Sequence, residues 1–341
     1  MKPPQPPPTL ATHKAPTGIS GFDAIAGGGL PRGRTTLLVG GPGSGKTVFA
    51  LQFLVHGVQH CKEPGIFVAL EETSQCILAN ADSFGWNITP AQRKKLFFLD
   101  AQPQSDLIQS GDFDLCGMLA GLEAQALATG ARRIVFDALD ILLALLPDAA
   151  AQRREIYRLH AWLLSRELTA IITLKADTDD THTISQQPFG FMQFMVDCAV
   201  ILNHGVLLGV SQRSLRVQKY RGSSFDENES PFLIGNSGFE IAGARTLDSV
   251  DTQVTTERVS SGVERLDTML GGGYYRGASV LVTGFSGTAK TTLSGAFVQA
   301  ACQRGERTLF VSFDSEGGEV IRNLASVGIR LGRHVENGVL R

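Results

Sequence analysis

A glycine-rich octapeptide that ends in lysine and threonine occurs twice in this chain. The first copy spans residues 40–47, GGPGSGKT, and fits the pattern G-x-x-x-x-G-K-[ST] completely. The second spans residues 284–291, GFSGTAKT, and departs from the pattern only at Ala289. Such a sequence forms a loop between a strand and a helix, and its backbone N–H groups surround phosphate oxygens. The first copy therefore predicts a site for a nucleoside triphosphate.

The repeat extends well beyond the octapeptide. Residues 17–29, TGISGFDAIAGGG, recur 244 residues later as SGVERLDTMLGGG, and Glu63 and Gly85 recur 243 residues later as Glu306 and Gly328. Such constant spacing indicates a duplicated domain. We expect a disordered leader over residues 1–16, a first domain over 17–245, a linker over 246–258 and the N-terminal part of a second domain over 259–341.

The composition agrees with a soluble α/β protein, with 43% hydrophobic residues and 38 glycines in 341 residues. A net charge of −2 gives no general attraction to nucleic acid or to an anionic membrane. The five cysteines are scattered without a C-x-x-C pair, which argues against disulfides and zinc and favours a reducing cytoplasm. The proline-rich start lacks the apolar core of a signal peptide, and the apolar run 141–146 is far shorter than the roughly 20 residues that span a bilayer.

Short apolar runs alternate with helical stretches in the first domain. The runs at 35–39, 66–70, 96–99, 134–136 and 170–174 predict a mostly parallel sheet with helices on both faces. Two later runs, 199–202 and 214–220, flank residues 203–205, NHG, which predict the turn of an antiparallel extension. We expect the domain to end near Ile241.

Each phosphate-binding loop has its own set of candidate nucleotide-binding residues. Lys46 is expected to reach the β- and γ-phosphates, and the Thr47 hydroxyl to bind Mg²⁺. The predicted nucleotide-binding residues are Gly41, Pro42, Gly43, Ser44, Gly45, Lys46 and Thr47 in the first loop, and Gly287, Thr288, Ala289, Lys290 and Thr291 in the second. If the position of Ala289 needs a positive φ, its Cβ weakens binding there.

Carboxylates follow two of the predicted strands. Asp137 ends the run 134–136, where it could bind Mg²⁺ through water or simply cap a turn, and the upstream loop favours the metal. Glu71 and Glu72 follow the run 66–70, where one of them could deprotonate the water that attacks the γ-phosphate; we favour Glu72. Alternatively, both are acidic residues at a helix N-terminus that Thr73 or Ser74 caps.

Two basic residues lie at the end of the last predicted strand, 214–220. Lys219 and Arg221 are two positions apart, so their side chains project from the same face of the strand. They could reach a γ-phosphate that a neighbouring subunit holds. From the residues alone, a solvated edge strand with basic residues is the better interpretation.

Together these motifs resemble the KaiC-like branch of the RecA superfamily. The resemblance rests on residues 18–23 with the three glycines 27–29, the first loop, residues 71–73 (EET), residues 84–86 (FGW) and residues 219–222 (KYRG). It covers residues 17–241 as a whole domain and 261–341 as the beginning of a second. It implies RecA-like domains in a hexameric ring with ATP between subunits, Glu71 and Glu72 as a catalytic pair, and Lys219 and Arg221 in contact with nucleotide across the interface.

The expected function is that of a Mg²⁺-dependent ATPase of signalling or clock type. One alternative is a serine/threonine autokinase in a longer parent protein. In the second domain, the positions that match Asp137 and Lys219 would fall beyond Arg341, and the glutamate pair becomes Asp314-Ser315. Kinase activity is therefore expected only if the second domain is completed. A second is a DNA-dependent recombinase or helicase, but residues 176–190 contain three aspartates and no lysine or arginine, which argues against nucleic acid. A third is a nucleotide sensor without catalysis.

Overall fold

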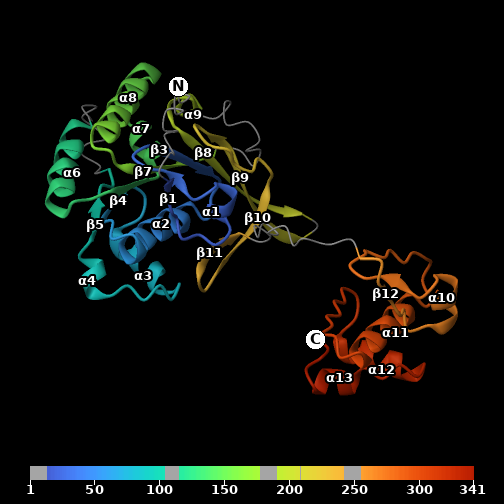
Figure 1. Ribbon diagram of the computed structural model, residues 1–341. Helices are drawn as coiled ribbons and strands as arrows, with labels where there is room; N and C mark the ends of the chain where they lie inside the picture. The colour runs from blue at the N-terminus through green and yellow to red at the C-terminus, as the bar shows by residue number, and fades with distance from the viewer. Residues whose placement is uncertain (1–13, 104–114, 177–189, 208, 242–254) are drawn as a thin grey trace, which may run out of the picture. The chain divides into compact units, whose positions relative to one another are not determined.

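The computed structural model describes residues 14–103, 115–176, 190–207, 209–241 and 255–341 (Figure 1). The chain divides into two units, Met1–Thr246 and Leu247–Arg341. Three segments that the sequence analysis singled out lie mostly outside the described residues: the leader, the aspartate-containing segment 176–190 and the linker. No helix among the residues described is both long and apolar enough to cross a membrane.

The first unit is built on one mixed sheet, as the alternating apolar runs predict. Its strands follow the order β11-β10-β9-β8-β3-β7-β6-β4-β5, and the pairs from β8 to β5 are parallel. The strands of the sheet are β3 (Thr35–Gly40), β4 (Gly65–Ala69), β5 (Leu96–Asp100), β6 (Arg133–Asp137), β7 (Thr169–Lys175), β8 (Cys198–Leu207), β9 (Val210–Tyr220), β10 (Ser230–Gly235) and β11 (Gly238–Ile241).

Helices cover both faces of this sheet, as Figure 1 shows for α2 and α3 on one side and α6 to α8 on the other. The described helices of the unit are α1 (Phe22–Ile25), α2 (Lys46–His60), α3 (Ser74–Asp82), α4 (Pro90–Arg93), α6 (Cys116–Thr129), α7 (Leu139–Leu143), α8 (Ala149–Ser165) and α9 (Met192–Met195). Because the central strands are buried on both faces, alternate residues serve two cores: Leu38 and Phe67 pack toward α2, and Leu37 and Ile66 toward α6 to α8.

Local sequence signals explain where several helices begin and end. Thr73 caps α3 by accepting a hydrogen bond from the backbone N–H of Cys76, one of the two caps that the sequence predicts. Thr89 and Gln92 form a capping box at α4, and Asp148 caps α8. Helix α6 ends at Gly130, whose φ of 65° suits a residue without Cβ.

The antiparallel extension differs from the prediction in two details. Strand β8 continues through residues 203–205 to Leu207, and residues 203–205 pair with residues 212–214 of β9. The predicted turn at these residues is therefore wrong. The bonds of an extended hairpin outweigh local turn propensity here. In addition, a bulge between Ala199 and Val200 leaves Gln218 without a cross-strand partner, so Tyr220 rather than Lys219 joins Leu215 and Val217 in the core.

Two short strands precede the phosphate-binding loop. The sequence predicts Lys14 and Ala15 to belong to the disordered leader, but they form β1 (Lys14–Ala15), which pairs antiparallel with β2 (Leu30–Pro31). Ala15 is fully buried, and the Lys14 ammonium lies over the ring of Tyr220. Tertiary contacts therefore order residues that proline-rich composition assigns to the leader.

A buried arginine joins the helix after the loop to the sheet. Arg133, at the start of β6, is fully buried and donates to Glu63 Oε2 at 2.6 Å and to the carbonyl oxygens of Phe53 and Pro16 at 2.7 and 2.9 Å. Its side chain passes close to Gly57, where an added Cβ would lie 2.6 Å from Arg133 Cδ. A buried guanidinium needs such partners, because an unpaired buried charge costs several kcal/mol.

The second unit repeats the beginning of the first. Its described elements are β12 (Arg258–Val259), α10 (Glu264–Met269), β13 (Tyr274–Tyr275), α11 (Lys290–Gln303), α12 (Gly317–Ser326) and α13 (Gly332–Glu336). β12 pairs antiparallel with β13 as β1 does with β2, so Arg258, predicted to lie in the linker, belongs to a strand. Residues 279–284 and 308–312, which match β3 and β4, are not in strands.

Candidate functional site

The first loop lies between β3 and α2, where its glycines have the backbone that the loop needs. Gly43 and Gly45 have φ values of 69° and 93°, and a Cβ on Gly40 would come within 2.5 Å of Ser44 Oγ. The Ser44 hydroxyl is buried and has no hydrogen-bond partner among the described residues. A buried hydroxyl without a partner in a glycine-rich loop between a strand and a helix fits a loop that receives the oxygens of a ligand.

Lys46 is the first residue of α2 and turns back across the loop. Its ammonium donates to the carbonyl oxygens of Gly40 and Gly41 at 2.7 and 3.0 Å. Burial lowers the pKa of Lys46, while the carboxylates of Asp137, Asp140 and Glu71 act to raise it. The lysine is therefore held over the loop, in the place where it can meet phosphate.

Asp137 ends β6 and lies beside the start of α2. Its Oδ2 accepts a hydrogen bond from Thr47 Oγ1 at 2.9 Å, and its Oδ1 accepts one from Thr173 Oγ1 at 2.7 Å. Burial raises the pKa of Asp137, and the hydrogen bonds from Thr173 and Thr47 and the charge of Lys46 oppose this. A hydroxyl and a carboxylate side by side are hard oxygen donors, so this pair suits Mg²⁺ bound together with phosphates.

Asp140 lies in the first turn of α7. It does not cap that helix, since Ala138 holds the N-cap position with a φ of 64°. Its Oδ1 instead accepts a hydrogen bond from the backbone N–H of Lys175 at 3.2 Å. Burial raises its pKa as well.

The glutamate pair lies between β4 and α3, and both residues are exposed. Burial is the main cause of the pKa shifts of Lys46 and Asp137, and the charge of Glu71 also contributes to both. Glu71 therefore lies close enough to the loop and to Asp137 for its charge to act on them.

Side chains from the end of β5 hold the backbone of this glutamate turn. Gln102 Nε2 donates to the carbonyl oxygens of Ala69 and Glu72 at 3.2 and 2.6 Å. The Asp100 carboxylate accepts from the backbone N–H and the hydroxyl of Ser74 at 2.6 and 2.9 Å. The edge strand therefore fixes the position of the turn relative to the sheet.

Lys219 and Arg221 lie away from this cluster, against the short helix α9. Lys219 Nζ donates to the carbonyl oxygens of Gln193 and Val196 at 2.5 and 2.7 Å, and Arg221 Nη2 donates to that of Phe194 at 2.7 Å. Burial lowers the pKa of Lys219, and the neighbouring Arg221 charge adds to this. The two cations are neighbours, as their spacing predicts, and within one chain their partners are carbonyl oxygens.

Sequence reasoning missed Thr173 and Gln102. Thr173 also accepts a hydrogen bond from the backbone N–H of Ala138 at 2.7 Å, so it holds both the carboxylate of Asp137 and the turn after it. The available signal was a hydroxyl residue within the otherwise apolar strand 170–174. Gln102 carried no comparable signal, because its contacts depend on how β5 pairs with β4.

The second loop holds its lysine as the first one does. Lys290 Nζ donates to the carbonyl oxygens of Gly284 and Phe285, both at 2.8 Å. Ala289 has a φ of 64°, so the position that is Gly45 in the first loop keeps a left-handed backbone despite its Cβ. The glutamate pair is replaced by Asp314 and Ser315, and residues 255–341 include no counterpart of Asp137.

The first unit combines a mostly parallel sheet with a strand-loop-helix that carries Lys46 and Thr47 and with Asp137 at a strand end. These features define a RecA-like P-loop NTPase. The family model of the KaiC ATPase matches residues 15–246 and again 259–341. The chain belongs to this family and has its P-loop ATPase fold.

Curated relatives carry clock-related names. The chain is 38% identical over 336 residues to the circadian clock protein KaiC2 of a Synechocystis species, covering 98% of this chain and 58% of the relative. It is 38% identical over 336 residues to the circadian clock oscillator protein KaiC of Parasynechococcus marenigrum, covering 97% and 64%. For KaiC of Thermostichus vulcanus the identity is 39% over 332 residues, covering 96% and 63%. The chain thus spans less than two thirds of each of these relatives.

Proposed function

We propose that the first unit binds ATP with Mg²⁺ and hydrolyses it. The observation that carries the proposal is the hydrogen bond between Thr47 and Asp137 beside the Lys46 ammonium. The backbone N–H groups of residues 41–45 and the N-terminus of α2 would hold the phosphates, and Lys46 would exchange the carbonyl oxygens of Gly40 and Gly41 for phosphate oxygens. Thr47 and Asp137 would hold Mg²⁺, which neutralises charge on the phosphates.

A glutamate would then accept the proton of the attacking water. Glu71 is favoured for this role, because its charge acts on both Lys46 and Asp137. Gln102 and Asp100 would keep the turn in place while the glutamate works. A positioned carboxylate of this kind contributes about 10² to 10⁴ in rate.

We further propose that the chain acts in a homo-oligomeric, hexameric ring with ATP between subunits. Lys219 and Arg221 are neighbouring cations that carbonyl oxygens of α9 hold in place. A phosphate on the adjoining subunit would be a stronger partner than a carbonyl oxygen, because it is charged. The cations would thus complete a site that one chain leaves open to solvent.

The names of the relatives support a clock-type or signalling role. Because those relatives are longer, we do not extend the proposal to autokinase activity. The second loop holds its lysine as the first one does, but the glutamate pair is replaced there by Asp314 and Ser315, so we assign turnover to the first unit.

The two P-loop lysines provide a matched test. Lys46→Ala should abolish ATP turnover, with a loss of at least about 100-fold, and Lys290→Ala should leave it within about twofold of the native rate. Equal losses in the two variants would contradict the assignment to the first unit. No Mg²⁺-dependent turnover in the native chain would overturn the function itself.

Subunit mixing tests the proposed interface. Lys46→Ala and Arg221→Ala chains should each be inactive, but a mixture of the two forms interfaces with one intact loop and one intact Arg221. Random equimolar mixing in a closed ring should restore about a quarter of the native turnover. A mixture as inactive as its components, under conditions where mixed rings are detected by native mass spectrometry, would remove the trans role of Arg221.

A further inference from the structure

Lys175 is the last residue of β7, the strand between the one that leads into the phosphate-binding loop and the one that ends in Asp137. In the sheet, β7 has β3 on one side and β6 on the other, and β4 follows β6. Lys175 pairs with Gly40, the first residue of the loop, and its backbone N–H donates to Asp140 Oδ1 at 3.2 Å. The backbone that carries this lysine is therefore held from both sides.

The alternation of side chains along β7 puts Lys175 on the face of the sheet that carries α2. Residues two apart on a strand project to the same side. Ile171 packs in the core with α2, and Thr173 donates to the Asp137 carboxylate beside this helix. Leu174 instead packs in the core with α6 to α8. Lys175 continues the series of Ile171 and Thr173, and it is exposed where the loop begins.

The register of the sheet places Lys175 between the loop and Glu71. Ala69 lies opposite Asp137 in β4 and β6, and Glu71 follows Ala69 by two residues. The register of β6 and β7 puts Thr173 beside Asp137, and Lys175 follows Thr173 by two residues. A phosphate that the loop holds, and that a water beside Glu71 attacks, must lie over the strand ends between them. Those strand ends belong to β7 and β6.

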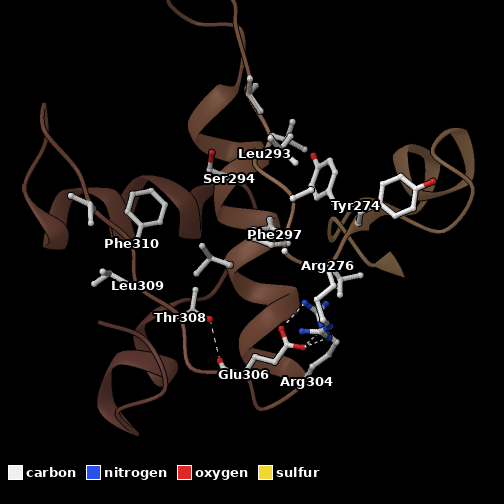
Figure 2. A pocket seen from close by; sticks show the side chains of 18 residues that line it. Tyr274, Arg276, Leu293, Ser294, Phe297, Arg304, Glu306, Thr308, Leu309 and Phe310 are labelled. Atoms are coloured by element: carbon white, nitrogen blue, oxygen red, sulfur yellow. Dashed lines mark hydrogen bonds and ion pairs between the residues drawn. The ribbon is translucent and has the colours of Figure 1, made fainter. Parts of the chain in front are cut away.

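Lys175 brings a second positive charge to the loop. Burial is the main cause of the lowered pKa of Lys46, and the charge of Lys175 adds to it. Within the described part of the chain, the Lys175 ammonium has no ion pair or hydrogen bond. In the second unit, by contrast, Arg276 and Arg304 both form ion pairs with Glu306 (Figure 2). An anion between the two lysines of the first unit would relieve their repulsion.

We propose that Lys175 binds the terminal phosphate of ATP within its own chain, so that the first unit distinguishes ATP from ADP. Because this contact presupposes that the loop holds a nucleotide, it rests on the proposed function of the first unit. The loop and the N-terminus of α2 would hold the phosphates that ATP and ADP share. Lys175 would meet the phosphate that ADP lacks, before any residue of an adjoining subunit takes part.

Affinities for a triphosphate and a diphosphate test this contact. The non-hydrolysable analogue AMP-PNP and ADP, each with Mg²⁺, are titrated by calorimetry into chains that carry Lys290→Ala, so that the second loop contributes little. Adding Lys175→Met should weaken binding of AMP-PNP by about 10-fold or more, and binding of ADP by less than about twofold. Lys175→Arg keeps the charge and should retain most of the affinity for AMP-PNP.

A matched lysine and a reactive nucleotide complete the experiment. Lys94 is exposed just before β5, at the opposite end of the sheet, and Lys94→Met should change neither affinity. An ATP derivative acylated on its terminal phosphate reports proximity in the unsubstituted chain. A lysine amine at that phosphate attacks the acyl carbon, forms an amide and releases ATP. Mass spectrometry should find the acyl group on Lys46 and on Lys175, and excess unmodified ATP should prevent both labels.

Several results would overturn the role of Lys175. Equal losses of affinity for AMP-PNP and ADP in Lys175→Met would show that the lysine does not recognise the terminal phosphate. Unchanged affinities would show that it only balances the neighbouring carboxylates. A label on Lys46 without one on Lys175 would place the Lys175 ammonium away from that phosphate. An unsubstituted chain that binds neither nucleotide would overturn the proposed function of the first unit and this contact with it, so the two failures are distinguishable.

Discussion

Gly45 and Ala289 stand at the same position of the two phosphate-binding loops, and both have a left-handed backbone, with φ values of 93° and 64°. The fold therefore demands this conformation regardless of the residue. Glycine adopts it without strain, whereas alanine brings its Cβ close to the following carbonyl oxygen. The second loop consequently stores strain that the first one avoids.

We expect Ala289→Gly to stabilise the start of α11 by about 1 kcal/mol, the strain relief less the added entropy of the unfolded glycine. The opening free energy of the amides in α11, measured by hydrogen exchange, gives the magnitude. Gly45→Ala is the matched reverse change. It should destabilise α2 by at least as much, because the new Cβ would also meet Ile234 Cδ1 at 2.5 Å. A stabilising Gly45→Ala would contradict the strain argument.

The two glutamates after β4 should differ in their effect on turnover. We expect Glu71→Gln to lower kcat by about 100-fold or more, with little change in KM, and Glu72→Gln to have a much smaller effect. The reason is that the charge of Glu71 acts on both Lys46 and Asp137. Single-turnover kinetics would separate chemistry from product release. A defect confined to Glu72→Gln would instead favour the choice made from sequence.

Thr173 should act as a positioning residue for Asp137. In Thr173→Val, Asp137 loses a donor and the backbone N–H of Ala138 loses its acceptor, at a cost of about 1–3 kcal/mol in the free energy of unfolding. Affinity for Mg²⁺ in the presence of ATP should fall about tenfold, because the carboxylate is no longer oriented. Thr173→Ser keeps the hydroxyl and should restore both. If the serine variant is as impaired as the valine variant, packing rather than hydrogen bonding is responsible.

Asp137 should make the stability of the first unit depend on pH in the absence of nucleotide. Burial raises its pKa in the folded chain, so the folded state binds this proton more tightly than the unfolded state. The free energy of unfolding should therefore fall as pH rises from the pKa of an unfolded aspartate, about 3.9, through the raised value. Urea unfolding at a series of pH values measures this slope.

Two asparagine variants and the release of a proton on Mg²⁺ binding test whether Asp137 is the group that titrates. Asp137→Asn should flatten the slope, and Asp140→Asn should flatten it independently, since burial raises that pKa too. Because Mg²⁺ needs the ionised carboxylate, binding of Mg²⁺ with ATP should release a proton, visible by calorimetry in buffers of different ionisation enthalpy. An unchanged slope in Asp137→Asn would show that another group titrates.

The pattern of apolar runs predicted the parallel part of the sheet, but it did not predict the pairing of β8 and β9. The apolar runs at β3 to β7 are strong signals because strands buried on both faces contain few polar residues. The turn at residues 203–205 was misplaced because a local dipeptide preference is worth less than the ladder of bonds between β8 and β9. The bulge opposite Ala199 has no sequence signature, although it decides that Tyr220 enters the core and Lys219 faces α9.

By itself, the sequence determined the phosphate-binding loops, the strand-end position of Asp137 and the family, because these depend on short patterns and on the repeat. Only the tertiary structure decided that Thr47 and Thr173 meet Asp137 and that Glu71 acts on the loop. It also decided that Ala289 adopts a left-handed backbone. These facts depend on which strands are neighbours, and pairing across the sheet joins residues far apart in the chain, such as Thr47 and Asp137, that no local pattern connects.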